Sequence, residues 1–600
     1  MKDAATASYS KKGDAIVKMN HDAIDAGAQQ IVKVEVPESW KNAQSEDLSV
    51  KHDGEGKLID YVNDILVPIN QFRGMQLPVS TFEAYQTGEV PLGSSAFEKR
   101  GIAIDVPVWN NETCIECGNC SYVCPHACIR PVILTKEELD NAPEGIRYQN
   151  AMQLDGYYYA MAISVYDCTG CGSCANVCPV NNAGKKAPAL VMTSFDDETA
   201  KEQEKYDYLV QLAEKQEVLD KFKISTVKGS QFRKPYLEFS GACAGCGETP
   251  YAKLVTQLFG DRMYIANATG CSSIWGNSSP STPYTTNAKG QGPAWANSLF
   301  EDNAEFGLGM FTGQNTLREQ TKEKVVALAE STDNADVKAA AAEYLDTYAD
   351  GSKNGAATDK LVAALEACGC DAAKEILAKK EFLSKKSQWI FGGDGWAYDI
   401  GFGGVDHVLA SGEDVNVFVF DTEVYSNTGG QASKSTNLGA IAQFQAAGKG
   451  TKKKDLAAIA MSYGYVYVAQ IAMGADYNQT VKAIAEAEAY PGPSLVIGYA
   501  PCINHGIKGG MKIAQTEEKK AVTSGYWNLF RFNPALAAEG KNPFHLDSKA
   551  PTTEYEDFIM GEVRYNALSR QNPERAKELF AEAKANAEAK YNRLKEMSDK

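Results

Sequence analysis

From residue 231 onward, short apolar runs alternate with glycine-rich turns and with segments of helical periodicity. The apolar runs lie at 236–239, 263–268, 390–391, 415–421 and 494–500. Each is short enough to be a buried strand, and the repeated order of strand, glycine turn and helix is typical of a parallel sheet. After the first run, Thr249 is expected to cap a helix with Pro250 at its first position. We therefore predict an α/β domain over residues 231–600, with a parallel sheet covered by helices on both faces.

The residues in front of this domain do not form another large core. Residues 1–37 show a helical pattern ending at Gly27 and an alternating strand-like run at 31–36. One helix and one strand cannot bury a core, so we expect this piece to be the tail of an absent preceding domain. Residues 38–105 form a small unit rich in proline and glycine turns, and we treat 106–200 as a separate domain.

Three further segments have a strongly polar or helical pattern. The stretch 196–221 is polar and helical, and we assign 201–230 as a linker. Alanine- and lysine-rich helices between 316 and 386 suggest an insertion or a lid in the parallel-sheet domain. The tail from Asn572 is predicted to be a charged, solvated helix.

The amino-acid composition argues against several functional classes of protein. The 600 residues carry a net charge of −17, so a basic surface for nucleic acid is not expected. No apolar run approaches about 18 residues, and the first residues lack a secretory signal, so we expect neither a membrane span nor export. Fifteen cysteines in clustered spacings then indicate metal ligands in a reducing, cytoplasmic compartment.

Two cysteine runs share the same spacing, Cys-x-x-Cys-x-x-Cys-x-x-x-Cys-Pro. A single Cys-x-x-Cys is also compatible with zinc or a redox dithiol, whereas two full runs are typical of paired [4Fe-4S] clusters. In such runs the fourth cysteine binds the other cluster, which predicts an α+β, ferredoxin-like module over residues 106–200. The first predicted set is Cys114, Cys117, Cys120 and Cys178, and the second is Cys168, Cys171, Cys174 and Cys124.

Four more cysteines follow predicted strands of the α/β domain. Cys243 and Cys246 follow the run 236–239, Cys271 follows 263–268, and Cys502 follows 494–500. Because ligands collect at the carboxyl ends of parallel strands, these four thiols are expected to converge on a third [4Fe-4S] cluster. Cys128, Cys368 and Cys370 lack such placement and are expected to be ordinary thiols.

A glycine turn at the same sheet edge suggests a diphosphate site. Gly393-Asp394-Gly395 follows the strand at 390, and glycine amides opening a helix can hold phosphate while the aspartate holds Mg²⁺. The Thr422 hydroxyl and the Val424 carbonyl would complete an oxygen shell. A Rossmann nicotinamide site is the alternative, but no G-x-G-x-x-G lies at a strand–helix turn, and no P-loop is present.

Together these motifs closely resemble those of single-chain pyruvate:ferredoxin (or flavodoxin) oxidoreductases. The resemblance rests on 97–101 (Phe-Glu-Lys-Arg-Gly), the eight ferredoxin-type cysteines, 244–250, 393–396 and Pro501-Cys502. It implies a small EKR-type domain at 38–105 and a thiamine diphosphate-binding domain at 231–600. It also implies that Asn427 lies near the reacting carbon and that the cofactor contacts are Glu248, Cys271, Gly393, Asp394, Gly395, Trp396, Thr422, Glu423, Val424, Tyr425, Ser426 and Asn427.

The resemblance implies oxidative decarboxylation of pyruvate with coenzyme A to acetyl-CoA and CO₂. Three [4Fe-4S] clusters, thiamine diphosphate and Mg²⁺ would pass electrons to ferredoxin or flavodoxin. The family's chain is about twice as long, so we expect this chain to be the C-terminal half of an enzyme that is a homodimer when complete. Two alternatives stay open: a relative acting on another 2-oxoacid such as 2-oxoglutarate, and an electron-transfer subunit without thiamine.

Overall fold

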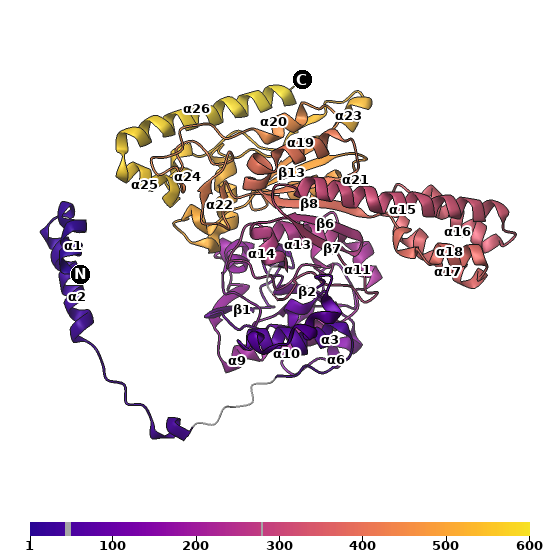
Figure 1. The fold of residues 1–600 in the computed structure, drawn as a ribbon, viewed down its shortest axis with the longest axis horizontal. Coiled ribbons are helices and arrows are strands. Elements are labelled where there is room, and N and C mark those ends of the chain that lie inside the picture. Colours follow the sequence, from indigo (N-terminus) through magenta and orange to yellow (C-terminus); the bar gives the residue numbers. More distant parts are fainter. Residues whose placement is uncertain (43–49, 278–279, 600) are drawn as a thin grey trace. The chain divides into compact units, whose positions relative to one another are not determined.

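The computed structural model describes residues 1–42, 50–277 and 280–599 (Figure 1). Within it, the contacts divide the chain into one unit of residues 1–51 and another of residues 52–600. Part of the predicted 38–105 unit, residues 43–49, lies outside the described residues.

The first unit contains two helices, α1 (Lys2–Tyr9) and α2 (Asp14–Gln29). They are held together by an ion pair of 2.5 Å between Lys2 and Asp25. The strand predicted at 31–36 is wrong: this segment has no regular structure, and Val32 is 81% exposed. Alternation alone does not make a strand, because a strand also needs a neighbour to accept its backbone hydrogen bonds.

The centre of the second unit is one eight-stranded sheet with the order β15-β14-β12-β13-β9-β8-β6-β7. The six strands from β12 to β7 are parallel, and β14 and β15 join antiparallel at one edge. The predicted α/β architecture is therefore confirmed. The strands are Met263–Ala268 (β6), Ala294–Ser298 (β7), Ser387–Gly393 (β8), Asn416–Asp421 (β9), Tyr467–Ile471 (β12), Ser494–Tyr499 (β13), Phe530–Phe532 (β14) and Phe544–Leu546 (β15).

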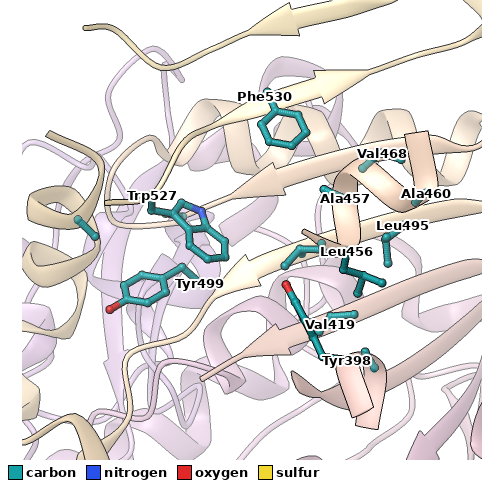
Figure 2. Close-up of a cluster of buried hydrophobic side chains, with 14 of the residues drawn as sticks. Tyr398, Val419, Leu456, Ala457, Ala460, Val468, Leu495, Tyr499, Trp527 and Phe530 are labelled. Carbon is teal, nitrogen blue, oxygen red and sulfur yellow. The ribbon is translucent and has the colours of Figure 1, made fainter. Parts of the chain in front are cut away.

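Helices cover both faces of this sheet, which explains why its central strands are apolar throughout. In β9, Val417 and Val419 pack into one core while Phe418 and Phe420 pack into the other. Figure 2 shows the first core, where Leu456 and Ala457 of a covering helix meet side chains of several strands. That face is covered by α15 (Asn303–Ser331), α19 (Phe402–Ala410) and α20 (Leu456–Met461), and the opposite face by α13 (Thr249–Phe259), α14 (Cys271–Asn277) and α21 (Tyr477–Ala489).

Two predicted details of this domain are wrong. Residues 236–239 are not a strand, since Leu237 makes only an isolated bridge to Tyr284. Helix α13 begins at Thr249 itself, with Glu248 at the N-cap, so Thr249 does not cap it. The glycine turn after β8 is followed first by a π-helical turn, Gly395–Ile400, and only then by α19.

The helices between 316 and 386 form an insertion with a core of their own. Helix α15 runs from the sheet into it, and α16 (Ala335–Asp346), α17 (Asn354–Cys368) and α18 (Asp371–Leu377) complete it. Figure 1 shows the insertion extending away from the sheet. It is therefore an insertion, and nothing in its position supports the predicted lid.

The two cysteine runs lie in a small α+β module. Its β1 (Asp105–Trp109) pairs with β5 (Leu190–Ser194), and β2 (Ile129–Leu134) pairs with β4 (Tyr158–Ile163), which also pairs with β3 (Gln149–Asn150). Two short helices, α5 (Asn119–Tyr122) and α7 (Ser173–Val177), carry the third cysteine of each run. Helix α10 (Glu202–Gln211) packs against β4 and buries Tyr206 and Leu209, so this part of the predicted linker belongs to the module's core.

A short helical segment precedes the module. Helix α3 (Lys57–Tyr61) continues through a π-helical turn into α4 (Val67–Asn70), and Tyr61, Val62, Ile65 and Leu66 form its small core. Among the described residues, no helix is long and apolar enough to cross a membrane.

The last helix, α26 (Pro573–Ser598), is not a fully solvated tail as predicted. Its charged positions cover only one side, whereas Ala576, Leu579 and Phe580 are buried in the main core. The Phe580 ring packs edge-on against Tyr565 at a centroid distance of 6.0 Å.

Phe580→Ala should destabilise the second unit by about 3–5 kcal/mol, since it leaves a cavity between α26 and the main core. Chemical unfolding followed by tryptophan fluorescence would measure the change. Glu578→Ala, on the exposed side of the same helix, is the matched control and should stay within about 0.5 kcal/mol of wild type. Equal stability of the two variants would show that α26 contributes little packing.

Candidate functional site

The eight cysteines of the two runs line two small cavities of the module. The first is lined by Cys114, Cys117, Cys120 and Cys178, with Trp109 and Tyr159 beside them. The second is lined by Cys124, Cys168, Cys171 and Cys174, and also by Cys128, which was expected to be an ordinary thiol. The structure thus brings together the same two sets of four that the spacing predicts, each completed by the last cysteine of the other run.

Local backbone geometry holds these thiols around the cavities. Gly118 and Gly172 cap α5 and α7 in the left-handed conformation, with φ of 78° and 76°, which turns each loop back on itself. Backbone N–H groups of Glu116 and Gly170 donate to Cys114 and Cys168 at 3.4 Å. Such N–H donors stabilise thiolate, the form that iron requires.

A third set of cysteines lies at the carboxyl edge of the main sheet. Cys271 begins α14 directly after β6, Cys502 follows β13, and Cys246 lies just before α13. The loops contact each other, since the Gly247 N–H donates to the Pro501 carbonyl at 3.2 Å. Burial, then the nearby Glu248 carboxylate, and then Cys246 and Cys502 raise the pKa of the Cys271 thiol. Cys243 is exposed. Burial raises the pKa of the Cys502 thiol to about 11, and the thiolate of Cys243 contributes to this rise.

None of these sets is arranged for a single metal ion. In the described part of the chain, no three or more His, Cys, Asp or Glu side chains lie close enough together to hold one ion. A cubane has a different requirement, because each thiolate binds a separate iron atom at a corner of the cluster. Four thiols that line one cavity fit this requirement.

The second cavity lies next to the third set. The His126 ring, which lines the second cavity, lies 3.0 Å from the carbonyl of Ala242, the residue directly before Cys243. Gly245, the residue directly before Cys246, packs so closely against Met511 that a side chain there would come within 2.7 Å of it. The order of the sites is therefore third set, second cavity, first cavity.

Beside the third set, oxygen donors converge on Asp394. The Thr422 hydroxyl donates to Asp394 Oδ1 and lies equally close, at 3.0 Å, to the Val424 carbonyl. The Ser433 hydroxyl donates to Asp394 Oδ2 at 2.5 Å. Burial, and secondarily Asp421, raise the pKa of Asp394 well above its usual value. The Thr422 N–H also donates to Asp394 Oδ1, at 3.2 Å. A buried carboxylate with hydroxyl and carbonyl oxygens beside it suits a hard cation such as Mg²⁺.

A bend at Glu423 brings these oxygens to the same side. Glu423 has φ of 61°, a strained value for a non-glycine residue, and its side chain points into the protein. There it pairs with Arg564 at 2.8 Å and Lys453 at 2.9 Å. Burial opposes its ionisation, but Lys453 and Arg564 lower the pKa of Glu423 to about 2. The Glu423 side chain therefore shapes the loop, and the predicted cofactor contact of this residue would be made by its backbone.

His505 connects the two loops, and sequence reasoning missed it. Its Nε2–H donates to the Thr422 carbonyl at 2.7 Å, and the Cys502 N–H lies 3.5 Å from Nδ1. Burial, and then Arg564, lower the pKa of His505 to about 3, so the imidazole is neutral. Ser433, Lys453 and Arg564 were missed as well. None of the four carries a local pattern, because each reaches the site through long-range contacts.

The remaining predicted cofactor residues are divided between the site and the core. The Glu248 carboxylate accepts from Trp275 at 2.7 Å, and burial raises its pKa to about 7. The Ser426 hydroxyl lies 3.2 Å from the Cys271 thiol. The Trp396 ring is buried against Gly392 and Gly401, so only its backbone is available to a ligand.

Gly393, Gly395, Tyr425 and Asn427 complete the predicted cofactor set. A side chain at Gly393 would meet only the Phe420 carbonyl, at 3.9 Å, so the turn is open there. The Tyr425 ring lies over Gly395, where a side chain would come within 2.5 Å of it. The side chain of Asn427 is exposed. Glycine at 393 thus leaves one side of the turn accessible, and glycine at 395 lets the Tyr425 ring pack tightly against the other side.

Comparison with protein families assigns three segments of the chain. A 4Fe-4S dicluster domain matches residues 110–182, and the C-terminal TPP-binding domain of thiamine pyrophosphate enzymes matches residues 363–497. Residues 50–103 match EKR, a domain of unknown function. These matches support [4Fe-4S] clusters and thiamine diphosphate as cofactors of this chain.

Several longer proteins are similar to the chain. The chain is 51% identical to a pyruvate-flavodoxin oxidoreductase of Enterobacter agglomerans and 50% identical to that of Klebsiella pneumoniae. It is also 51% identical to the pyruvate:ferredoxin oxidoreductase of Moorella thermoacetica. Over its whole length, the chain is thus similar to pyruvate-flavodoxin/ferredoxin oxidoreductases. Each match covers 100% of this chain but only 50–51% of the relative, so the chain spans about half the length of these relatives.

Cys271→Ser should remove one cluster and leave two. After anaerobic reconstitution, wild type is expected to hold about twelve iron atoms, four per cluster, and the variant about eight. Iron analysis and electron paramagnetic resonance of the reduced protein would measure this. Cys370→Ser, in the insertion, is the control and should retain the wild-type iron content. Loss of all clusters in Cys271→Ser would contradict a separate third site.

Asp394→Ala should weaken Mg²⁺-dependent binding of thiamine diphosphate by more than about tenfold. Even groups that only support a metal ligand cost about 10–100-fold when removed, and Asp394 is the carboxylate on which the other oxygens converge. Calorimetric titration with and without Mg²⁺ would measure the change. Asp406→Ala, which removes a carboxylate of α19 that accepts from Tyr463, is the control. Unchanged binding in Asp394→Ala would mean that the turn is only a connection.

Proposed function

We propose that this chain is the cofactor- and cluster-bearing, C-terminal half of an enzyme that oxidises pyruvate with coenzyme A and reduces ferredoxin or flavodoxin. The observation that carries the proposal is the contact of 3.2 Å between Cys271 and Ser426. It joins the third cysteine set to the loop that presents Thr422 and Val424. A two-electron oxidation at a thiamine site needs such an electron acceptor within reach.

Each group of residues has a distinct role in this proposal. Thiamine diphosphate, when bound, supplies an electron sink for decarboxylation of a 2-oxoacid. Asp394, Thr422 and the Val424 carbonyl would hold Mg²⁺ at its diphosphate, and Asn427 would lie near the reacting carbon. The third cysteine set, the second cavity and the first cavity would then hold three [4Fe-4S] clusters in series, ending near the surface of the module.

The sheet edge around this site is shaped to be covered by another protein segment. Large apolar side chains are exposed in the loops and helical turns that follow the strands there. They are Ile274 (45% exposed), Leu299 (58%), Ile400 (51%), Phe444 (87%) and Ile503 (63%). Exposed apolar side chains gathered around one site mark an interaction surface. We propose that the half of the relatives absent from this chain covers it, in a complete enzyme that is homodimeric and cytoplasmic.

Two alternative functions can be distinguished from the proposed one by experiment. An enzyme for another 2-oxoacid, such as 2-oxoglutarate, would share every feature described, because the substrate pocket would lie largely in the other half. Comparing 2-oxoacids in the completed enzyme decides between them. An electron-transfer subunit would hold the clusters without thiamine, which an assay for bound thiamine diphosphate would reveal.

The chain alone should not oxidise pyruvate, even with clusters, thiamine diphosphate, Mg²⁺ and coenzyme A. It would lack the substrate-positioning groups of the other half, and preorganised groups of this kind contribute about 7–11 kcal/mol to catalysis. Pyruvate-dependent reduction of a viologen dye would measure activity. Adding the missing half of a relative in trans should restore it, whereas rapid reduction by the isolated chain would refute the proposed division.

A further inference from the structure

A buried lysine lies between the main sheet and the two-cavity module. Lys253 belongs to α13, the helix that starts just after Cys246, and its side chain is only 2% exposed. Its ammonium donates a hydrogen bond to the backbone carbonyl of Ser121. Ser121 directly follows Cys120 of the first cavity and precedes Cys124 of the second. The charge is therefore located at the loop that supplies ligands to both cavities.

Among the described residues, no Asp or Glu carboxylate forms an ion pair with Lys253. The neighbouring Arg130 differs, because it pairs with Glu238. Burying an unpaired ammonium costs several kcal/mol of folding free energy. The buried Lys253 ammonium therefore needs a negative charge from another source. The Ser121 carbonyl that accepts from Lys253 also accepts from the Cys124 N–H, at 3.2 Å, so the ammonium lies beside a ligand of the second cavity. Burial lowers the pKa of Lys253 to about 8, and the thiolate of Cys124 opposes this shift most strongly.

The iron–sulfur clusters would supply that missing charge. Iron binding requires deprotonated thiols, and four thiolates give a [4Fe-4S] centre a net negative charge that grows when an electron is added. A nearby positive charge in a poorly solvated interior then favours the reduced form, because the Coulomb interaction is weakly screened there.

We propose that Lys253 is the internal counterion of the cluster held by Cys124, Cys168, Cys171 and Cys174, and that it raises that cluster's reduction potential. The inference rests on the proposed cluster ligands and adds a positioning role for a residue outside them. Because this cavity lies between the third set and the first cavity, the lysine would stabilise an electron on the middle member of the series.

The test uses the full 600-residue chain, reconstituted anaerobically and titrated with dithionite, which adds one electron to each cluster. Three variants separate charge from packing. Lys253→Met keeps the length without charge, Lys253→Gln keeps a donor for the Ser121 carbonyl without charge, and Lys253→Arg keeps the charge. Lys136→Met removes an exposed lysine of the same module, paired with Asp140, and is the control.

In both neutral variants, one cluster should become harder to reduce while the iron content stays at the wild-type level. At a fixed potential its ratio of reduced to oxidised form should fall about tenfold, equivalent to about 59 mV for one electron. Lys253→Arg and the control should titrate like wild type. Loss of that cluster in Lys253→Met and Lys253→Gln, with retention in Lys253→Arg, would also support a requirement for charge.

Two results would overturn the proposal. Neutral variants with full iron content and unchanged potentials would show that the charge does not act on a cluster. Loss of the cluster in all three variants would show that Lys253 has a packing role only. The proposed ligand sets would survive both results, because iron content and the spectrum of wild type test them separately.

Discussion

The ion pairs of Glu423 with Lys453 and Arg564 are the interaction on which the site depends. They hold one residue in a backbone conformation that a side chain normally disfavours, and that bend turns the Thr422 hydroxyl and the Val424 carbonyl toward Asp394. Without these cations, Glu423 would be a buried, unpaired carboxylate and the loop would relax. Strain at a functional loop persists only when surrounding contacts impose it. Here the contacts come from two distant parts of the chain.

Sequence reasoning succeeded where the chemistry is local. The cysteine spacing grouped the eight thiols of the two runs as they line the cavities, because loop length limits which ligands can meet, but it did not place Cys128 at the second cavity. Asp394 and Thr422 could be placed together because both follow strands of a parallel sheet. It failed for residues such as Arg564 and His505, whose partners are distant in sequence. It also failed at 31–36 and 236–239, since an apolar pattern does not reveal whether a strand has a neighbour.

The two kinds of site are physically joined. His505 donates to the Thr422 carbonyl, while the loop that carries it begins with Cys502. A displacement of the cysteine loop would therefore disturb the oxygen site, and the reverse holds as well. Ser426 adds a second connection through its contact with Cys271. The thiol set and the oxygen set thus form one rigid arrangement at the edge of the sheet.

Helix α15 gives the insertion a mechanical property that its separate core alone would not. The helix has 29 residues, which corresponds to a length of roughly 44 Å, and it is shared between the sheet and the insertion. Near its start, Asn303 donates to the Phe391 carbonyl of β8, two residues before Gly393. The projecting bundle is thus a lever whose short arm is anchored beside the glycine turn. A molecule that binds the far end of the insertion would therefore exert a torque on the strand that precedes Asp394.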